Sequence, residues 1–409
     1  MSTGKKTVPE IRFSGFSEPW AQRKLGDLAE IVGGGTPDTN NSAYWDGDID
    51  WYAPAEMEGQ RYAKGSVRKI TELGLQKSSA KILPAHRTVL FTSRAGIGKM
   101  AILQRSGATN QGFQSLVLKD GTDPYFIYSM GEKIKDMAEG VASGSTFLEI
   151  SGKMLGNLEI MVPNLKEQGS IATFFRSIDD LIAIYQHKYE ALVAVKKAML
   201  EKMFPREGET VPQIRFAGFT DPWEQRKVSD LFETVESGNR LPKTMICKGN
   251  IPYVVASNEN NGIVDYISEN QNDFHGNRMK LFAENSITFS IDNPEAIFVQ
   301  KVPFFTSNIM RVLHNDKYNY YHIVCFSELI KGLTSYYNWS FKFSGPVVMS
   351  SDVFVPVKAN GNIDLAEIEK IGKTLSELDN LITLHQRKCE VLKNLKSALL
   401  NKMFVNTTE

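Results

Sequence analysis

The sequence lacks several features that would place it in a familiar class of protein. Its 409 residues contain only three cysteines, Cys247, Cys325 and Cys389, which are too scattered for a Cys-x-x-Cys metal site and odd in number for a disulfide framework. No apolar run approaches the roughly 18 residues of a membrane helix, and the start of the chain has no apolar signal core. We therefore expect a cytoplasmic protein with reduced cysteines.

The chain also lacks an excess of charge of either sign. Lys and Arg total 47 and Asp and Glu total 47, so the formal net charge is zero. Because overall basicity is the usual sign of a nucleic-acid-binding protein, such a role has to rest on local charge. The hydrophobic fraction of 42% is ordinary for a globular protein, and the length predicts two or more domains.

No catalytic motif is complete. Gly96-Ile97-Gly98-Lys99 is similar to a phosphate-binding loop, but Ser93 stands where that loop needs glycine and Met100 where it needs a hydroxyl. Asp292-Asn293-Pro294-Glu295 lacks the second proline and the aromatic residue of the amino-methyltransferase motif. No metal-ligand spacing is found among the six histidines, which stand at positions 86, 187, 275, 314, 322 and 385. We expect no catalytic, cofactor-binding or metal site in this chain.

An internal repeat organises the chain. The run Val8-Pro9-Glu10-Ile11-Arg12-Phe13-Ser14-Gly15-Phe16 returns 203 positions later as Val211-Pro212-Gln213-Ile214-Arg215-Phe216-Ala217-Gly218-Phe219. Residues 8–32 and 211–235 share 16 identities in 25. A second repeat joins residues 171–204 with 371–404 and ends in Lys-Met-Phe both times. Chance does not produce such a match, so the chain is a duplication.

Both copies of the second repeat have the pattern of a long helix. No proline or glycine interrupts the first copy, which predicts an exposed rod of about 34 residues that spans about 51 Å, with an ordinary amphipathic core helix as the alternative. Lys188 and Lys388 interrupt the apolar pattern at the same place. The predicted coiled-coil seam has 3-4 spacing and consists of Ile171, Phe174, Ile178, Leu181, Tyr185, Leu192, Val195 and Met199.

Between the shared borders lie two segments rich in β-branched and aromatic residues, at about residues 25–165 and 228–358. Their kinship is faint: Val89-Leu90-Phe91-Thr92-Ser93 aligns with Ile287-Thr288-Phe289-Ser290-Ile291. Similar borders around different contents indicate two variants of one recognition module on a common frame.

One stretch of the first segment carries strong local charge. Residues 61–105 hold ten basic side chains against the single acid Glu72, a net charge of +9, and such a density can neutralise DNA phosphates. The alternative is a solvated face balanced by the six acids between Asp38 and Glu58. The ten basic residues are Arg61, Lys64, Arg68, Lys69, Lys77, Lys81, Arg87, Arg94, Lys99 and Arg105.

Polar loop clusters add candidate base-reading side chains, because Asn and Gln can pair with adenine and Arg with guanine. Turn formation is the alternative for each cluster. The predicted DNA-binding residues are Arg61, Lys64, Arg68, Lys69, Arg94, Lys99, Arg105, Asn110 and Gln111 in the first segment and Asn258, Asn260 and Asn261 in the second.

Together these features resemble the specificity subunits of type I restriction-modification systems. The resemblance covers nearly the whole chain. The second copy departs from the pattern where Glu367-Ile368 replaces Glu167-Gln168, and its loops have no strict match to the glycine-rich loops of the first. The motifs that carry the resemblance are Gly34-Gly35-Thr36-Pro37, Arg94-Ala95-Gly96-Ile97-Gly98-Lys99, Thr109-Asn110-Gln111-Gly112 and, most specifically, Leu158-Glu159-Ile160-Met161-Val162-Pro163 with Glu167-Gln168.

The resemblance implies an α+β fold with pseudo-twofold symmetry, in which two target recognition domains, residues 1–165 and 206–358, are separated by two spacer helices, residues 166–205 and 359–409, in an antiparallel coiled coil. It implies a non-catalytic subunit that reads a bipartite, asymmetric double-stranded DNA site and assembles two methyltransferase subunits with restriction and motor subunits. S-adenosylmethionine, ATP and Mg would belong to those partners. Two alternatives are a recognition subunit of a methylation-only complex and a DNA-independent interaction scaffold.

Overall fold

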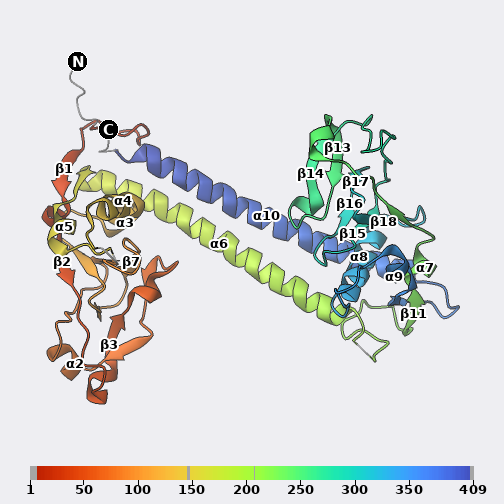
Figure 1. The fold of residues 1–409 in the computed structure, drawn as a ribbon. Coiled ribbons are helices and arrows are strands. Elements are labelled where there is room, and N and C mark those ends of the chain that lie inside the picture. The colour runs from red at the N-terminus through yellow and green to blue at the C-terminus, as the bar shows by residue number, and fades with distance from the viewer. Residues whose placement is uncertain (1–6, 145–147, 207, 406–409) are drawn as a thin grey trace. The chain divides into compact units, whose positions relative to one another are not determined.

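The computed structural model describes residues 7–144, 148–206 and 208–405 (Figure 1). The chain divides into two compact units, one made of residues 1–185 and 387–409 and the other of residues 186–386. Each unit therefore holds one mixed α/β domain together with part of each of the two longest helices.

The domain of the first unit is built on three sheets. A two-stranded sheet pairs β1 (Ala21–Lys24) with β10 (Glu159–Val162). A five-stranded sheet has the order β2 (Ala29–Gly33), β9 (Gln114–Leu118), β6 (Thr88–Phe91), β7 (Met100–Leu103) and β4 (Tyr62–Ala63), and a three-stranded sheet the order β5 (Arg68–Ile70), β3 (Trp45–Tyr52) and β8 (Gly107–Thr109). The helices are α1 (Leu25–Leu28), α2 (Glu72–Gln76), α3 (Pro124–Ser129), α4 (Gly131–Val141) and α5 (Gly152–Asn157).

The domain of the second unit repeats this arrangement. Here β11 (Trp223–Lys227) pairs with β19 (Asp352–Pro356), and a four-stranded sheet has the order β12 (Val235–Ser237), β18 (Met310–Leu313), β15 (Ser286–Ser290) and β16 (Ile297–Gln300). A three-stranded sheet has the order β14 (Ile263–Ile267), β13 (Lys248–Val254) and β17 (Phe305–Thr306), and the helices are α7 (Val228–Leu231), α8 (Tyr320–Thr334) and α9 (Gly345–Ser350). The duplication expected from the borders is confirmed in both domains, although β4 and α2 have no counterparts among the described residues of the second unit.

The central strand of each larger sheet explains why these segments fold as they do. Every residue of β6 and of β15 is buried. In β6, Val89 and Phe91 face a core that also contains Phe126 and Phe175, whereas Leu90 faces a separate core with Tyr52. Because successive side chains of a strand point to opposite faces, a strand covered on both sides buries every side chain. In β15 the buried side chains include Ser286, Thr288 and Ser290, which alternate with Ile and Phe.

Two helices of 39 residues, α6 (Leu165–Met203) and α10 (Leu365–Met403), run antiparallel within each unit. In the first unit, Lys396 Nζ lies 2.7 Å from Asp179 Oδ1. In the second unit, Lys196 Nζ lies 2.6 Å from Asp379 Oδ1. The two ion pairs join residues at matching positions of the repeat, so they are two copies of one contact that fixes the helix register.

The helix seam differs from the predicted one at three of its eight positions. The predicted Leu181 and Val195 are wrong, since their side chains are 43% and 46% exposed, and Ile182 and Lys196 lie on the inner face instead. Lys188 is exposed and does not interrupt the seam. The pattern misled because α6 carries a second, exposed apolar stripe beside the seam.

The correct seam positions on α6 are Ile171, Phe175, Ile178, Ile182, Tyr185, Tyr189, Leu192, Lys196, Met199 and Met203, all buried or half-buried. On α10 the exposed Lys388 likewise lies off the seam, whose position there is the buried Cys389. The predicted Phe174 is half-buried outside the helix pair, where its ring packs edge-on against Phe13 at 5.6 Å.

Candidate nucleic-acid interface

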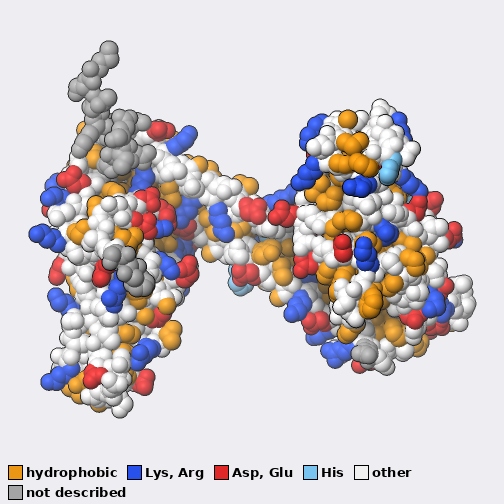
Figure 2. All heavy atoms as spheres, in the orientation of Figure 1, with side chains coloured by type: hydrophobic (Ala, Val, Ile, Leu, Met, Phe, Trp, Pro, Cys, Tyr) orange, Lys and Arg blue, Asp and Glu red, His pale blue; other side chains and the backbone are white. Residues whose placement is uncertain are grey.

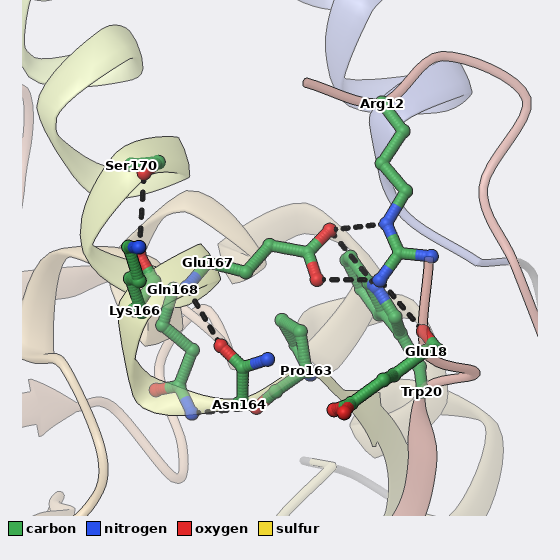
Figure 3. Close-up of polar contacts among 9 residues, drawn as sticks. All are labelled: Arg12, Glu18, Trp20, Pro163, Asn164, Lys166, Glu167, Gln168 and Ser170. Atoms are coloured by element: carbon green, nitrogen blue, oxygen red, sulfur yellow. Dashed lines mark hydrogen bonds and ion pairs between the residues drawn. The ribbon is translucent and has the colours of Figure 1, made fainter. Parts of the chain in front are cut away.

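A buried ion pair joins the segment before β1 to the start of α6 (Figure 3). Arg12 Nε and Nη2 each donate to one oxygen of Glu167 at 2.7 Å, and Nη2 also donates to the backbone oxygen of Glu18 at 2.6 Å. Trp20 Nε1 donates to the same carboxylate at 3.3 Å. The Glu167 side chain is 1% exposed, and its hydrogen bonds raise the pKa of the Arg12 guanidinium above its ordinary value. The charge of Glu167 is therefore balanced by a bidentate arginine instead of by water.

The second unit contains the same contact. Arg215 Nε and Nη2 donate to the two oxygens of Glu367 at 2.7 Å, and that carboxylate is also 1% exposed. One difference is visible: Trp223 is buried like Trp20, but its Nε1 has no hydrogen-bond partner among the described residues. The pair at Glu367 consequently rests on arginine alone.

In each unit a main-chain hydrogen bond connects the segment that carries the arginine to the second long helix. We call the ion pair together with this hydrogen bond the clamp. Ile11 N donates to Lys402 O at 3.0 Å, and Ile214 N donates to Lys202 O at 2.9 Å. These carbonyls lie in the last turns of α10 and α6, where a helix offers no partner of its own. The repeated Val-Pro-x-Ile-Arg-Phe segment is thus explained by packing: in each unit it ties the start of one long helix to the end of the other.

Half of the predicted basic stretch is neutralised inside the first domain. Among the described residues, five of its ten cations form ion pairs, and Lys99 pairs with Glu58 from the acidic stretch. Arg61 pairs with Asp180 on α6. The other three are Lys69, Arg87 and Arg105. Acids between Asp38 and Glu58 therefore neutralise part of the basic stretch, as the alternative interpretation predicted. The net charge of +9 counted from the sequence is larger than the charge that this stretch presents to solvent.

Asp50 is the centre of that neutralisation. Its side chain is 1% exposed on β3, and its oxygens lie 3.8 Å from both Lys69 Nζ and Arg105 Nε. The hydroxyl of Ser66 donates to it at 3.3 Å. Burial and the charge of Asp50 raise the pKa of the neighbouring Tyr52 to about 12. Lys69 and Arg105 accordingly hold the three-stranded sheet together as well as facing solvent.

Arg68 is placed differently. Its guanidinium lies over the ring of Trp45 at 3.6 Å and near that of Trp51 at 5.8 Å, and the two indoles pack edge to face. Together with the exposed Lys64, it forms no ion pair among the described residues. Figure 1 shows β3 and α2 at the end of the first domain away from the long helices, and Arg68 is exposed on β5, which pairs with β3. Figure 2 shows mixed charges over the visible face of this domain.

Two predicted loops of the first domain are tight turns. In Arg94–Lys99, Ala95, Gly96 and Gly98 have positive φ, and the Thr92 hydroxyl donates to Gly96 O at 2.6 Å while accepting from Lys99 N at 3.0 Å. Arg94 is half-buried in this turn, without an ion pair among the described residues.

The other loop contains the predicted amides. Asn110 Oδ1 accepts from Gly112 N at 2.8 Å, a local bond that shapes the turn. Gln111 is exposed and accepts from the Thr36 hydroxyl. Of the two amides, Gln111 is therefore the one with freedom to reach outward.

The predicted asparagines of the second domain are turn builders. Asn258 uses both ends of its amide, donating to Glu295 and accepting from Asn293 Nδ2 at 2.8 Å. Asn260 and Asn261 have positive φ of 47° and 51°, which asparagine tolerates better than most residues. All three are exposed, so DNA contact by them stays a prediction.

The sequence reasoning missed a hollow of about 730 Å³ on the second domain. It is lined by the cations Arg240, Lys243 and Lys248 together with Tyr253 and Asn308, among others. Lys248 is paired with Asp265 at 2.6 Å. Figure 2 shows an apolar patch with Lys and Arg beside it over the region of β13 and β14.

The positions of four glycines in the sequence could have indicated the region of this hollow. Gly47 in β3 and Gly249 in β13 both lie where an added Cβ would come within 2.6 Å and 2.5 Å of the backbone of the neighbouring strand. Gly34 and Gly238 likewise approach the strands β8 and β17. Only glycine fits such crossings, so aligning these glycines pairs the two three-stranded sheets residue by residue.

Comparison with known proteins identifies the duplicated fold. The family described as "Type I restriction modification DNA specificity domain" matches residues 17–194 and again residues 220–394. The chain belongs to the type I restriction-modification specificity subunits. Its fold, two similar α+β domains with two long helices, is the one expected from the resemblance.

Individual relatives of this specificity subunit agree. It is 31% identical to the specificity subunit of the type I restriction enzyme MjaIX of Methanocaldococcus jannaschii, over 94% of this chain and 92% of that one. It is 28% identical to the EcoR124I/EcoR124II specificity subunit of Escherichia coli over 39% of this chain and 41% of that one. The crystal structure of a type I S subunit from M. genitalium has the same fold, with a TM-score of 0.69 and 15% identity over 98% of this chain and 100% of that one.

Specificity subunits are recognition subunits and not enzymes, in agreement with the incomplete catalytic motifs. In the parts of the chain that the structure describes, no cluster of three or more His, Cys, Asp or Glu side chains could hold a metal ion. A search of the same residues for a helix long and apolar enough to cross a bilayer found none.

Proposed function

We propose that this specificity subunit reads a bipartite, asymmetric double-stranded DNA sequence, with one half-site for each recognition domain. The recognition domains are residues 1–165 and 206–358, and the spacer helices are residues 166–205 and 359–409. The observation that carries the proposal is the exposed Arg68 on the three-stranded sheet of the first domain, stacked on tryptophan, with the exposed Lys64 between β4 and β5. A planar guanidinium in such a position can contact phosphate or guanine.

The strand registers support an asymmetric target. Arg68 pairs across the sheet with Trp51, and Asp265 pairs in the same way with Tyr253. A cation over tryptophan in one domain thus corresponds to a carboxylate beside tyrosine in the other. Side chains that differ in charge at matching positions favour different bases, so we expect two different half-sites.

The contact residues divide by their surroundings. In the first domain, Arg68, Lys64, Arg94 and Gln111 are the primary candidates. Lys69, Lys99 and Arg105 are secondary candidates because each also holds an acidic residue. In the second domain, Arg240, Lys243 and Asn308 around the hollow are added to the predicted Asn258, Asn260 and Asn261.

The partners we propose are two methyltransferase subunits, together with the restriction and motor subunits of a type I complex in the cytoplasm. Exposed apolar side chains repeat on the two helices, Leu181 and Val195 on α6 matching Leu381 and Leu395 on α10. Exposed apolar stripes mark sites of protein contact, and two equivalent stripes suit two copies of one partner. S-adenosylmethionine, ATP and Mg would be bound by these partners.

The test measures binding of the subunit, purified with its methyltransferase partner, to the duplex found by mapping methylated adenines in host DNA. Arg68→Ala should weaken binding, and the slope of log K against log salt should fall in magnitude by about one if a phosphate contact is lost. Lys153→Ala, which removes an exposed charge on α5 away from the three-stranded sheet, is the matched control.

Unchanged affinity and salt slope for Arg68→Ala and Lys64→Ala together would remove this end of the domain from the interface. Absence of any DNA binding by the wild-type complex would favour the DNA-independent scaffold instead. Methylation without ATP-dependent cleavage in the native complex would favour the methylation-only alternative. Methyl transfer by the isolated chain would contradict the assignment of chemistry to partners.

A further inference from the structure

Strand β4 of the first domain has no counterpart among the described residues of the second domain, and the residue before it contacts α6. Strand β4 adds to the edge of the five-stranded sheet by pairing in parallel with β7. Arg61 directly precedes β4. Its main chain is fixed to β7, because Ile102 N donates to Arg61 O at 2.9 Å. The Arg61 side chain is only 22% exposed. Its position is therefore fixed at both the main chain and the guanidinium.

The guanidinium of Arg61 ends on α6. Its Nη2 lies 2.5 Å from Asp180 Oδ1, and its Nη1 donates to Tyr125 Oη at 3.3 Å. The Arg61 guanidinium also lies over the ring of Tyr62 at 4.8 Å. These contacts turn the positive charge toward the helix, so Arg61 is poorly placed to meet a phosphate.

Tyr125 extends the contact into a network. Its hydroxyl donates to Asp179 Oδ2 at 2.7 Å, and the other oxygen of Asp179 lies 2.7 Å from Lys396 Nζ on α10. Tyr125 is 1% exposed on α3, and Arg176 of α6 lies over its ring at 4.9 Å. One connected set of polar contacts thus joins the sheet edge, α3 and both long helices within the first unit.

This network gives the first domain a second point of attachment to α6. The first is the clamp at Glu167, and Asp180 stands 13 residues further along the same helix. At about 1.5 Å per residue, the two points are about 20 Å apart on the helix. A body held at one point can rotate about it in any direction, whereas a body held at two separated points can rotate only about the line that joins them.

The second domain is attached to α10 between Leu365 and Ser376, whose hydroxyl donates to Tyr320 Oη of α8 at 3.5 Å. Asn319 Nδ2 donates to Glu369 Oε1 at 2.9 Å, and His322 Nε2 lies 3.1 Å from Leu365 O. The position that matches Asp180 is Asn380, which is exposed and cannot hold an arginine by charge. The distal tether is therefore a property of the first domain.

We propose that Arg61 is a positioning residue that fixes the orientation of the first recognition domain on its spacer helix and so makes the subunit strict about the number of base pairs between its half-sites. This inference rests on the proposed bipartite recognition. It also changes the expected role of Arg61 from a DNA contact to a tether.

The experiment uses the complex with the methyltransferase partner and three duplexes, which carry the native spacing, one added base pair and one deleted base pair. Methylation rates give a discrimination ratio for the native spacing. Arg61→Gln and Asp180→Asn should each lower this ratio by about two- to fivefold, the range of a partly exposed ion pair, while the salt slope on the native duplex stays unchanged. The charge swap Arg61→Asp with Asp180→Arg should restore the ratio.

Asp180→Asn is the decisive variant, because an acidic side chain cannot be a phosphate contact. Arg68→Ala serves as the control for DNA contact: it should slow methylation of all three duplexes alike and lower the salt slope. The inference is overturned if Arg61→Gln behaves like Arg68→Ala, or if Asp180→Asn keeps the wild-type ratio. A wild-type complex that does not discriminate spacing at all would contradict bipartite recognition itself, a result distinct from either outcome.

Discussion

Replacing Arg12 or Arg215 with Ala should destabilise the unit that contains it, and the second replacement should cost more. Removing one partner of a buried ion pair leaves the other charge without compensation, which costs about 3–5 kcal/mol. Both carboxylates are 1% exposed, so neither can recover its charge balance from water. After the change, Glu167 still accepts a hydrogen bond from Trp20 Nε1 at 3.3 Å, whereas Trp223 gives no such bond to Glu367.

One hydrogen bond to a charged group contributes about 1.5–3 kcal/mol, and the 3.3 Å length places this one at the weak end. The loss of stability for Arg215→Ala is therefore expected to exceed that for Arg12→Ala by about 1.5 kcal/mol. Urea denaturation followed by tryptophan fluorescence measures both free energies of unfolding, with Arg12→Ala/Glu167→Ala and Arg215→Ala/Glu367→Ala completing two double-mutant cycles. Equal losses, or a larger loss for Arg12→Ala, would refute the role given to Trp20, and a loss under about 1 kcal/mol at both sites would refute the clamp.

Three further predictions concern charge, thiols and modularity. Burial lowers the pKa of Lys133 to about 8, below its value in the unfolded chain. With respect to this group, the protein is therefore most stable above the unfolded pKa, and this stability is lost as the pH falls through about 8. Lys133→Met should have a higher melting temperature than the wild type at pH 7, and the difference should shrink toward pH 10. A maleimide should label Cys247 in the native protein, and Cys325 and Cys389 only after denaturation, because both are buried and burial raises the pKa of the Cys325 thiol. Exchange of residues 25–165 for the same segment of a related subunit should change one methylated half-site and leave the other, which methylome sequencing reads directly.

Much of the architecture could be predicted because the duplication is visible as a sequence repeat, which can be recognised without knowing any contact. The borders repeat since Arg12 and Arg215 perform the same packing task at the helix ends. The long helices were also predictable, but their seam was not. Leu181 fits the apolar spacing as well as Ile182 does, and only the partner helix decides which side chain is covered.

The residues of the candidate interface were harder to predict from the sequence, because a count of charges does not say where each side chain points. Arg61 and Arg68 contribute equally to a net charge of +9, yet one faces Asp180 on α6 and the other lies over Trp45. The hollow of the second domain escaped for a related reason. Its cations Arg240, Lys243 and Lys248 lie within nine residues, but the rest of its wall comes from β13, β14 and the residues after β17, which only folding brings together.

The last described residues of the chain belong to the core of the first domain. Phe404 packs against Trp20 at 6.1 Å, Phe126 at 5.5 Å and Phe175 at 5.9 Å, and Lys133 donates to its carbonyl at 3.1 Å. During synthesis, the ribosome therefore makes the whole second domain before it delivers the side chain that completes the first. Until then the aromatic core of the first domain lacks the Phe404 ring, so we expect this domain to complete its folding only after the second domain has been made.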